Sequence, residues 1–182
     1  DVSHGNLSRE VPVLGSTAEL LDIRHWEMAQ GRFLPEGDVD RGSLVAVLGI
    51  KLKQELFGGG RAIGEWVRIG DRRFRVIGVL ASEGRSIGVD VEEIAIIPVA
   101  TAQQIFNTNT LFRILVEARD REMLPMVIEH VEQTIRDRHQ GERDVTVITQ
   151  DAVLATFDKI LQALTLTVAG IAAISLAVAG IL

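Results

Sequence analysis

The end of the chain limits what it can fold into more than any other feature. No charged side chain follows Lys159, so residues 160–182 form an uninterrupted apolar segment whose only polar members are Gln162, Thr165, Thr167 and Ser175. As an α-helix rising about 1.5 Å per residue, this segment would be roughly 34 Å long, and the hydrocarbon core of a bilayer is about 30 Å thick. We therefore predict a transmembrane helix over residues 158–182, cut short by the end of the sequence. A buried core helix is the alternative, but such a long charge-free stretch is rare in one.

Small residues recur along the apolar segment at helical spacing. Ala169, Ala173 and Ala177 follow one another at every fourth position, with Gly170 and Gly180 nearby. Small side chains at this spacing let helices approach closely within a membrane. We interpret the three alanines as a candidate transmembrane packing face.

The rest of the sequence reads as an acidic, folded body. Of the 182 residues of the whole chain, 47% are hydrophobic, and the formal net charge is −6. The apolar content excludes disorder, and the acidic balance argues against a nucleic-acid partner. The absence of cysteine excludes disulfides, thiolate metal sites and cysteine nucleophiles. Because the chain begins at Asp1 without an initiator methionine or a signal-like segment, we expect it to be a fragment or a processed product.

Hydrophobic patterning predicts strands and helices in mixed order along this body. A hairpin is expected at Gly70-Asp71, where two alternating apolar runs meet, and the Ser16–Glu19 segment has the form of a capping box opening a helix. Pro98 indicates an edge strand or the end of a strand. We expect strands at 11–14, 44–48, 66–69, 74–80, 94–99, 111–118 and 145–148, and helices at 20–23, 50–57, 100–106 and 123–139.

Motifs for catalysis or cofactor binding are weak. Gly58-Gly-Gly60 matches neither phosphate-binding glycine pattern and is better explained as a helix stop. The four histidines lack the spacing of metal ligands. The acidic cluster Asp90, Glu92 and Glu93 is best explained by solvation, and Arg73 and Arg75 mark the solvent face of a strand, although Arg72, Arg73 and Arg75 could contact phosphates.

One serine matches a catalytic pattern. Ser86, in Gly84-Arg-Ser-Ile-Gly88, fits the G-x-S-x-G spacing of a nucleophile elbow, but no helix is predicted to follow it as that chemistry requires.

The order of the segments is more specific than any one motif. It runs through Gly31-Arg-Phe33, Val45-Ala-Val-Leu-Gly49, Leu56-Phe-Gly58, Phe74-Arg-Val-Ile-Gly-Val79 and Ile97-Pro-Val-Ala-Thr101, and ends in the apolar segment. Over nearly its whole length the chain resembles the MacB-type periplasmic core domain of ABC transporter permeases, the group that includes FtsX-like permeases.

This resemblance implies an α+β fold: a porter-like α/β subdomain with an inserted small β-rich subdomain, followed by a transmembrane helix. Residues 1–30 and 108–157 would form the porter-like part, and residues 31–107 the inserted part. The resemblance also implies no catalytic residue, metal or cofactor in this domain.

The resemblance further implies a place and partners. The body would lie on the extracytoplasmic, periplasmic side of the bacterial inner membrane, in a permease that dimerises, pairs with a cytoplasmic ABC ATPase and in some members works with a periplasmic adaptor protein. ATP-driven motion would be transmitted through the membrane helices to move substrate outside. The alternatives are a membrane-anchored hydrolase that uses Ser86, and a tethered binding module without an ATPase.

Overall fold

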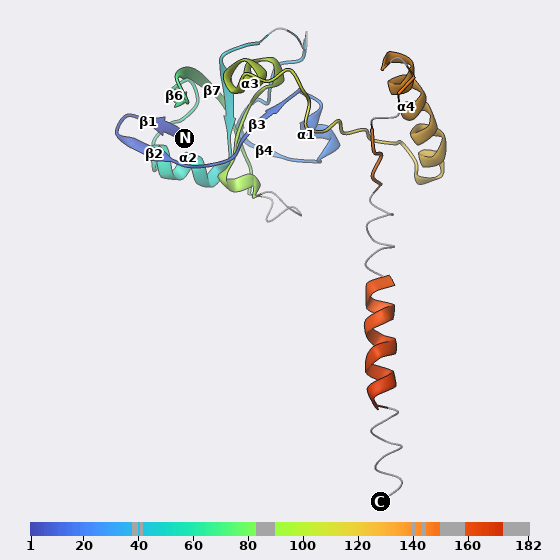
Figure 1. Ribbon diagram of the computed structural model, residues 1–182. Helices are drawn as coiled ribbons and strands as arrows, with labels where there is room; N and C mark the ends of the chain where they lie inside the picture. The colour runs from blue at the N-terminus through green and yellow to red at the C-terminus, as the bar shows by residue number, and fades with distance from the viewer. Residues whose placement is uncertain are drawn as a thin grey trace, which may run out of the picture. The chain divides into compact units, whose positions relative to one another are not determined.

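The computed structural model describes residues 1–37, 40, 42–82, 90–139, 141–142, 145–149 and 159–172. The chain divides into two compact units, Asp1–Glu117 and Ala118–Leu182. The first unit is a mixed sheet with short helices, and the described part of the second is helical (Figure 1). The predicted α+β class is therefore confirmed.

One eight-stranded sheet organises the first unit. Its strand order is β2-β1-β6-β7-β5-β8-β3, and β4 pairs with β7 off this path. The pairing is mixed, because β3–β8 and β5–β7 are parallel and the other pairs are antiparallel. The strands are β1 (Val2–His4), β2 (Leu7–Arg9), β3 (Val13–Ser16), β4 (Met28–Gly31), β5 (Val45–Leu48), β6 (Trp66–Ile69), β7 (Arg72–Leu80) and β8 (Ala95–Pro98).

Strand β7 is the centre of this sheet. Its first half pairs with β6, its middle with β5 and its end with β4. The β6–β7 hairpin turns at Gly70-Asp71 as predicted, and Gly70 has a φ of 60°, a conformation that glycine adopts without steric cost. Pro98 is the last residue of β8, so the strand-end alternative is confirmed.

Alternation along the strands separates two apolar clusters. Phe74, Val76 and Ala46 belong to the first cluster, together with Leu52 and Leu56 of α2. Ile77 and Leu80 of β7 and Val47 of β5 contact the second cluster, which also holds Leu20 of α1, Phe33 and Leu34. Because neighbours in a strand point to opposite sides, the two clusters lie on opposite faces of the sheet.

The helices of the first unit follow the predicted pattern closely. They are α1 (Leu20–Ile23), α2 (Ile50–Phe57), the 3-10 turn η1 (Val91–Glu93) and α3 (Val99–Phe106). The predicted capping box is wrong, because Ser16 ends β3 and its hydroxyl donates to the Thr17 carbonyl. The N-cap of α1 is Glu19, which makes no side-chain capping bond.

The second unit contains the 3-10 turn η2 (Arg121–Met123), α4 (Leu124–Arg138) and a helix over residues 159–172. Pro125 sits in the first turn of α4, where its missing N–H costs nothing. The apolar residues that recur at helical spacing along α4 are half-buried: Leu124, Val127, Ile128, Val131 and Ile135.

Two predicted strands are wrong within the described residues. The structure assigns no strand to residues 111–118 or to 145–148. Both segments have the right apolar patterning, but a strand also needs a hydrogen-bonding partner, and none pairs with them among the described residues.

The predicted division of the chain into a porter-like part (1–30 and 108–157) and an inserted part (31–107) stays a prediction. Strands β1 to β4, from residues 2–31, share one sheet with β5 to β8, from residues 45–98.

Candidate functional site

A small hollow opens beside the junction of β8 and α3. It is lined by the segment from Ser16 to Glu19 and by Leu34, Pro35, Pro98 and Val99, and its volume is about 60 Å³. Pockets for drug-sized ligands run to roughly 300–1,000 Å³, whereas a single water needs only about 10–15 Å³. This hollow therefore has room for a few waters and not for a bulky organic cargo.

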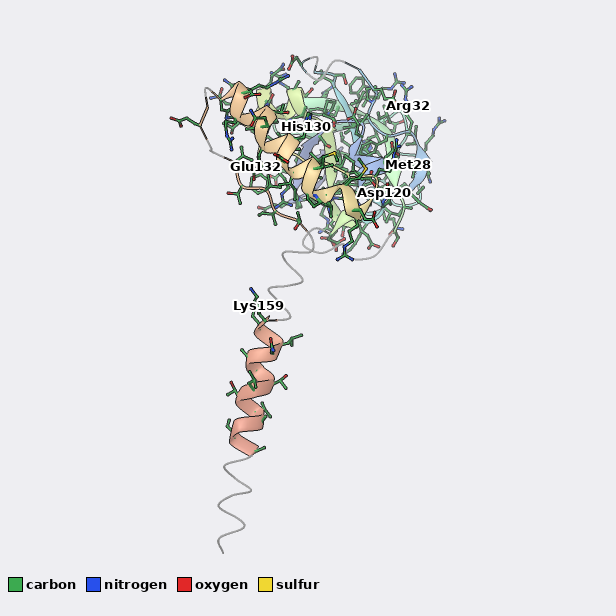
Figure 2. All side chains as sticks on the ribbon, turned by 90° about the vertical axis from the view of Figure 1, so that its right-hand side faces the viewer. Met28, Arg32, Asp120, His130, Glu132 and Lys159 are labelled. Carbon is green, nitrogen blue, oxygen red and sulfur yellow. The ribbon has the colours of Figure 1, made fainter. Side chains whose placement is uncertain are left out.

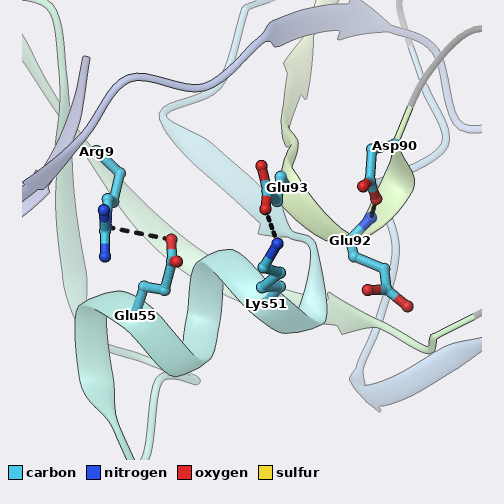
Figure 3. Close-up of polar contacts among 6 residues, drawn as sticks. All are labelled: Arg9, Lys51, Glu55, Asp90, Glu92 and Glu93. Atoms are coloured by element: carbon cyan, nitrogen blue, oxygen red, sulfur yellow. Dashed lines mark hydrogen bonds and ion pairs between the residues drawn. The ribbon is translucent and has the colours of Figure 1, made fainter.

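The acidic residues Asp90, Glu92 and Glu93 lie between β7 and β8, and each has a structural partner. Asp90 accepts a hydrogen bond from the Glu92 backbone N–H at 3.0 Å, and Glu93 pairs with Lys51 of α2 (Figure 3). The Ser82 hydroxyl donates to the Glu92 carboxylate. The hydrogen bond and charge of Glu93 raise the pKa of Lys51. The Glu93–Lys51 pair ties η1 to α2, and each of the three carboxylates has a structural partner.

A second ion pair joins α2 to the edge of the sheet. The Arg9 Nε lies 3.2 Å from the Glu55 carboxylate, connecting β2 with α2 (Figure 3). Helix α2 is thus held by two ion pairs, one near each end, and by the apolar packing of Leu52 and Leu56 in the first cluster.

The histidines of the first unit have separate contacts. The His4 ring stacks on Phe57 with centroids 4.1 Å apart, and its Nδ1 lies 2.8 Å from the Trp66 carbonyl oxygen. The Nε2 atom of His25 lies 3.6 Å from a carboxylate oxygen of Glu117. In the second unit, His130 is on α4. Across the described residues, no group of three or more His, Cys, Asp or Glu side chains could hold a metal ion.

The arginines of the hairpin divide between the two faces of β7. Arg73 and Arg75 are exposed, as predicted, while Arg72 points to the other face and donates to Gln104 of α3 at 3.2 Å. Ser86, the candidate nucleophile, lies outside the described residues.

The described part of the apolar segment is a helix with exposed side chains. Lys159 stands at its start, and the side chains project from it all round (Figure 2). Leu166 is 68% exposed and Val168 65%. Of the candidate packing face, Ala169 is on this helix, while Ala173 and Ala177 lie outside the described residues. In the described ranges, no helix has both the length and the apolar composition to cross a membrane.

Two kinds of sequence comparison agree on the relationship of this chain. Residues 1–134 match the model of the MacB-like periplasmic core domain. The chain is 32% identical over 182 residues to the pyoverdine export ATP-binding/permease protein PvdT of Pseudomonas aeruginosa, covering 99% of this chain and 28% of that protein. It is 32% identical over 187 residues to the macrolide export ATP-binding/permease protein MacB of Bdellovibrio bacteriovorus, covering 99% and 29%. The chain thus spans under a third of these relatives.

Solved structures share the fold. The extracellular domain of the noncanonic ABC-type transporter YknZ from Gram-positive bacteria aligns with a TM-score of 0.67 at 18% identity, over 81% of this chain and 75% of that one. The periplasmic region of MacB from Actinobacillus actinomycetemcomitans aligns with a TM-score of 0.66 at 22% identity, over 86% and 70%. Because the family match covers most of the sequence and the fold agrees with it, this chain belongs to the family of MacB-like periplasmic core domains.

Proposed function

We propose that this chain is the extracytoplasmic domain of a MacB-like ABC transporter permease in a bacterial inner membrane. The observation that carries the proposal is the family match over residues 1–134. Relatives that align with the whole chain are export proteins with ATP-binding and permease parts. ATP would be hydrolysed by a partner subunit or by a fused domain outside these 182 residues.

In this proposal the domain works mechanically. Residues 158–182 form a transmembrane helix, which receives motion from the ATPase and passes it to the sheet outside. The exposed apolar side chains of the helix at 159–172 support this part, because such a surface calls for lipid or neighbouring helices around it. The permease would act as a dimer, and a periplasmic adaptor protein would complete the assembly.

In this proposal the hollow at the junction of β8 and α3 is not a cargo site. A volume of about 60 Å³ cannot enclose a bulky export substrate, so cargo recognition is assigned to surfaces formed in the complete transporter. The predicted division into porter-like and inserted parts belongs to this proposal as well, and limited proteolysis of the complete transporter would test it.

Cysteine labelling of the full-length protein tests the location. Since this chain has no cysteine, Asn109→Cys on an exposed turn creates a single reporter once cysteines elsewhere in the protein are replaced. A membrane-impermeant maleimide should label it in intact spheroplasts. Leu166→Cys, on the apolar helix, is the matched control and should stay unlabelled because the bilayer covers it.

Two results would count against the proposal. Labelling of Asn109→Cys only after the cells are lysed would put the body in the cytoplasm. Rapid labelling of Leu166→Cys in intact spheroplasts would show that lipid does not cover the helix.

A further inference from the structure

One stretch of the sheet lies open where the rest of the same face is covered. Ile77 and Leu80 of β7 contact the second apolar cluster, beneath α1 and the Phe33-Leu34 segment. Arg73 and Arg75 precede Ile77 at alternate positions and so share its face, yet both are exposed. The covering layer therefore stops before it reaches the hairpin.

Strand pairing adds two residues of β6 to this open stretch. Trp66 lies directly opposite Arg75, and Arg68 directly opposite Arg73, in the antiparallel register. Directly opposed residues project on the same side of a sheet. Trp66 is 52% exposed and Arg68 is also exposed. We call these four residues, Trp66, Arg68, Arg73 and Arg75, the arginine face.

The guanidinium groups of the arginine face are partly fixed in position. The Arg68 Nε donates to the Gly70 carbonyl at 3.1 Å, and the Arg75 Nε donates to the Gly64 carbonyl at 3.3 Å. Holding the side chain by its Nε leaves the terminal amino groups to bind elsewhere, and a group held in advance loses less entropy on binding. Among the described residues, no ion pair joins Arg68, Arg73 or Arg75 to a carboxylate.

This arrangement is unfavourable for an isolated domain. Like charges directly opposite on a sheet destabilise it, and Arg68 faces Arg73 across the hairpin. The whole chain has a net charge of −6, so carboxylates are in excess, yet none pairs with these arginines within the described structure. Glu55 and Glu93 instead pair with Arg9 and Lys51. A ligand that brings its own carboxylates would relieve the repulsion.

We propose that the arginine face docks an acidic segment of a partner protein. Carboxylates of that segment bind the guanidinium forks of Arg68, Arg73 and Arg75, whose planar geometry suits a carboxylate. An apolar group of the segment packs on Trp66, since arginine and tryptophan are the residue types that dominate protein interfaces.

A fluorescent oligoglutamate peptide is the probe for this surface. Anisotropy titrations should show that it binds the whole chain, with affinity that falls as salt is added. The double variant Arg73→Gln/Arg75→Gln should bind at least ~tenfold more weakly, as expected when charge-assisted hydrogen bonds are lost. Arg119→Gln/Arg138→Gln removes the same charge at exposed positions of the second unit and should bind as the unchanged chain does.

Four results would overturn the proposal. Undiminished peptide binding by Arg73→Gln/Arg75→Gln would show that the peptide binds elsewhere. An equal loss of affinity in the control pair would show that the affinity depends only on the net charge of the chain. Binding to phosphatidylglycerol vesicles but not to the peptide would identify a lipid surface. A dimer that dissociates in Arg73→Gln/Arg75→Gln would make a second copy the occupant. If the double variant fails to fold by circular dichroism, Arg73→Gln alone decides, because Arg73, unlike Arg75, makes no hydrogen bond to a turn among the described residues.

Discussion

At the scale of single residues, close packing around Gly49 constrains the first unit. Gly49 separates β5 from α2, and its backbone N–H donates to the Ile94 carbonyl at 2.8 Å. A Cβ added there would collide with the backbone carbonyl oxygens of Val91 and Glu92. Because these atoms belong to the backbone, they cannot turn aside as a flexible side chain would.

We therefore expect Gly49→Ala to destabilise the domain by about 1–3 kcal/mol, the usual cost of overpacking. Gly59→Ala is the control, since a Cβ there would meet nothing within 4 Å. Urea denaturation measures both. A Gly49→Ala variant as stable as the Gly59→Ala variant would contradict the close packing.

The carboxyl group of Glu19 offers a second measurement at this scale. A hydrogen bond from the Thr17 side chain, and then one from its own backbone, lowers the pKa of Glu19 below 4.5. A lowered pKa means that this contact stabilises the fold above pH ~4.5 and is lost as the pH falls through the folded value. Thr17→Val should move the pKa of Glu19 back toward 4.5 in an NMR titration, and an unchanged midpoint would show that the hydrogen bond is absent in solution.

At the scale of elements, β7 holds the first unit together, since it pairs with β4, β5 and β6. Phe74 on this strand is fully buried in the first apolar cluster, whereas Phe112 is 95% exposed. Phe74→Ala should cost about 3–5 kcal/mol, because it leaves a cavity in the core. Phe112→Ala should leave the free energy of unfolding nearly unchanged. Equal losses in urea denaturation would contradict the assignment of this core.

The elements also differ in how far the sequence predicts them. Helix α2 and the β6–β7 hairpin follow directly from apolar spacing bounded by glycine turns. Strands β1, β2 and β4 were missed, because they are three or four residues long and β2 is exposed at every position. No local pattern marks such a strand, and long-range pairing creates it, as when Val2 pairs with Ile69.

The same limit applies to the arginine face. The sequence identifies Arg73 and Arg75 as solvent-facing, and the two-residue turn at Gly70-Asp71 places Arg68 opposite Arg73. The sequence of the hairpin therefore predicts that these two arginines are opposite each other. It does not predict how much of this sheet face is covered, because that depends on where α1 and Phe33 pack.

The apolar helix gives a prediction at the element scale for the candidate packing face. If Ala169, Ala173 and Ala177 face a neighbouring helix, Ala169→Leu and Ala173→Leu should each slow transport by the full-length permease, because a larger side chain forces the helices apart. Val168→Phe is the control, because position 168 lies about 100° from Ala169 and about 140° from Ala173 around a helix of 3.6 residues per turn. An unchanged transport rate in the Ala169 and Ala173 variants would indicate that this face is directed toward lipid.

At the scale of the whole molecule, two properties belong together in the proposed permease. An acidic body holds every charged residue of the chain, and an apolar segment follows Lys159. The proposed function gives this division a purpose, since a body outside the membrane that is moved by an ATPase would need a connection through the bilayer. The body needs no catalytic site for that task.

In the proposed permease, ATP moves this domain. The most direct test of this motion is electron–electron double resonance on the full-length transporter in lipid nanodiscs, with a spin label at Asn109→Cys in each copy of a dimer. The chain supplies no cysteine of its own, so each copy carries one label here. We predict that ATP shifts the distance between the two labels and that hydrolysis restores it. A distance that is the same with and without ATP would contradict the account.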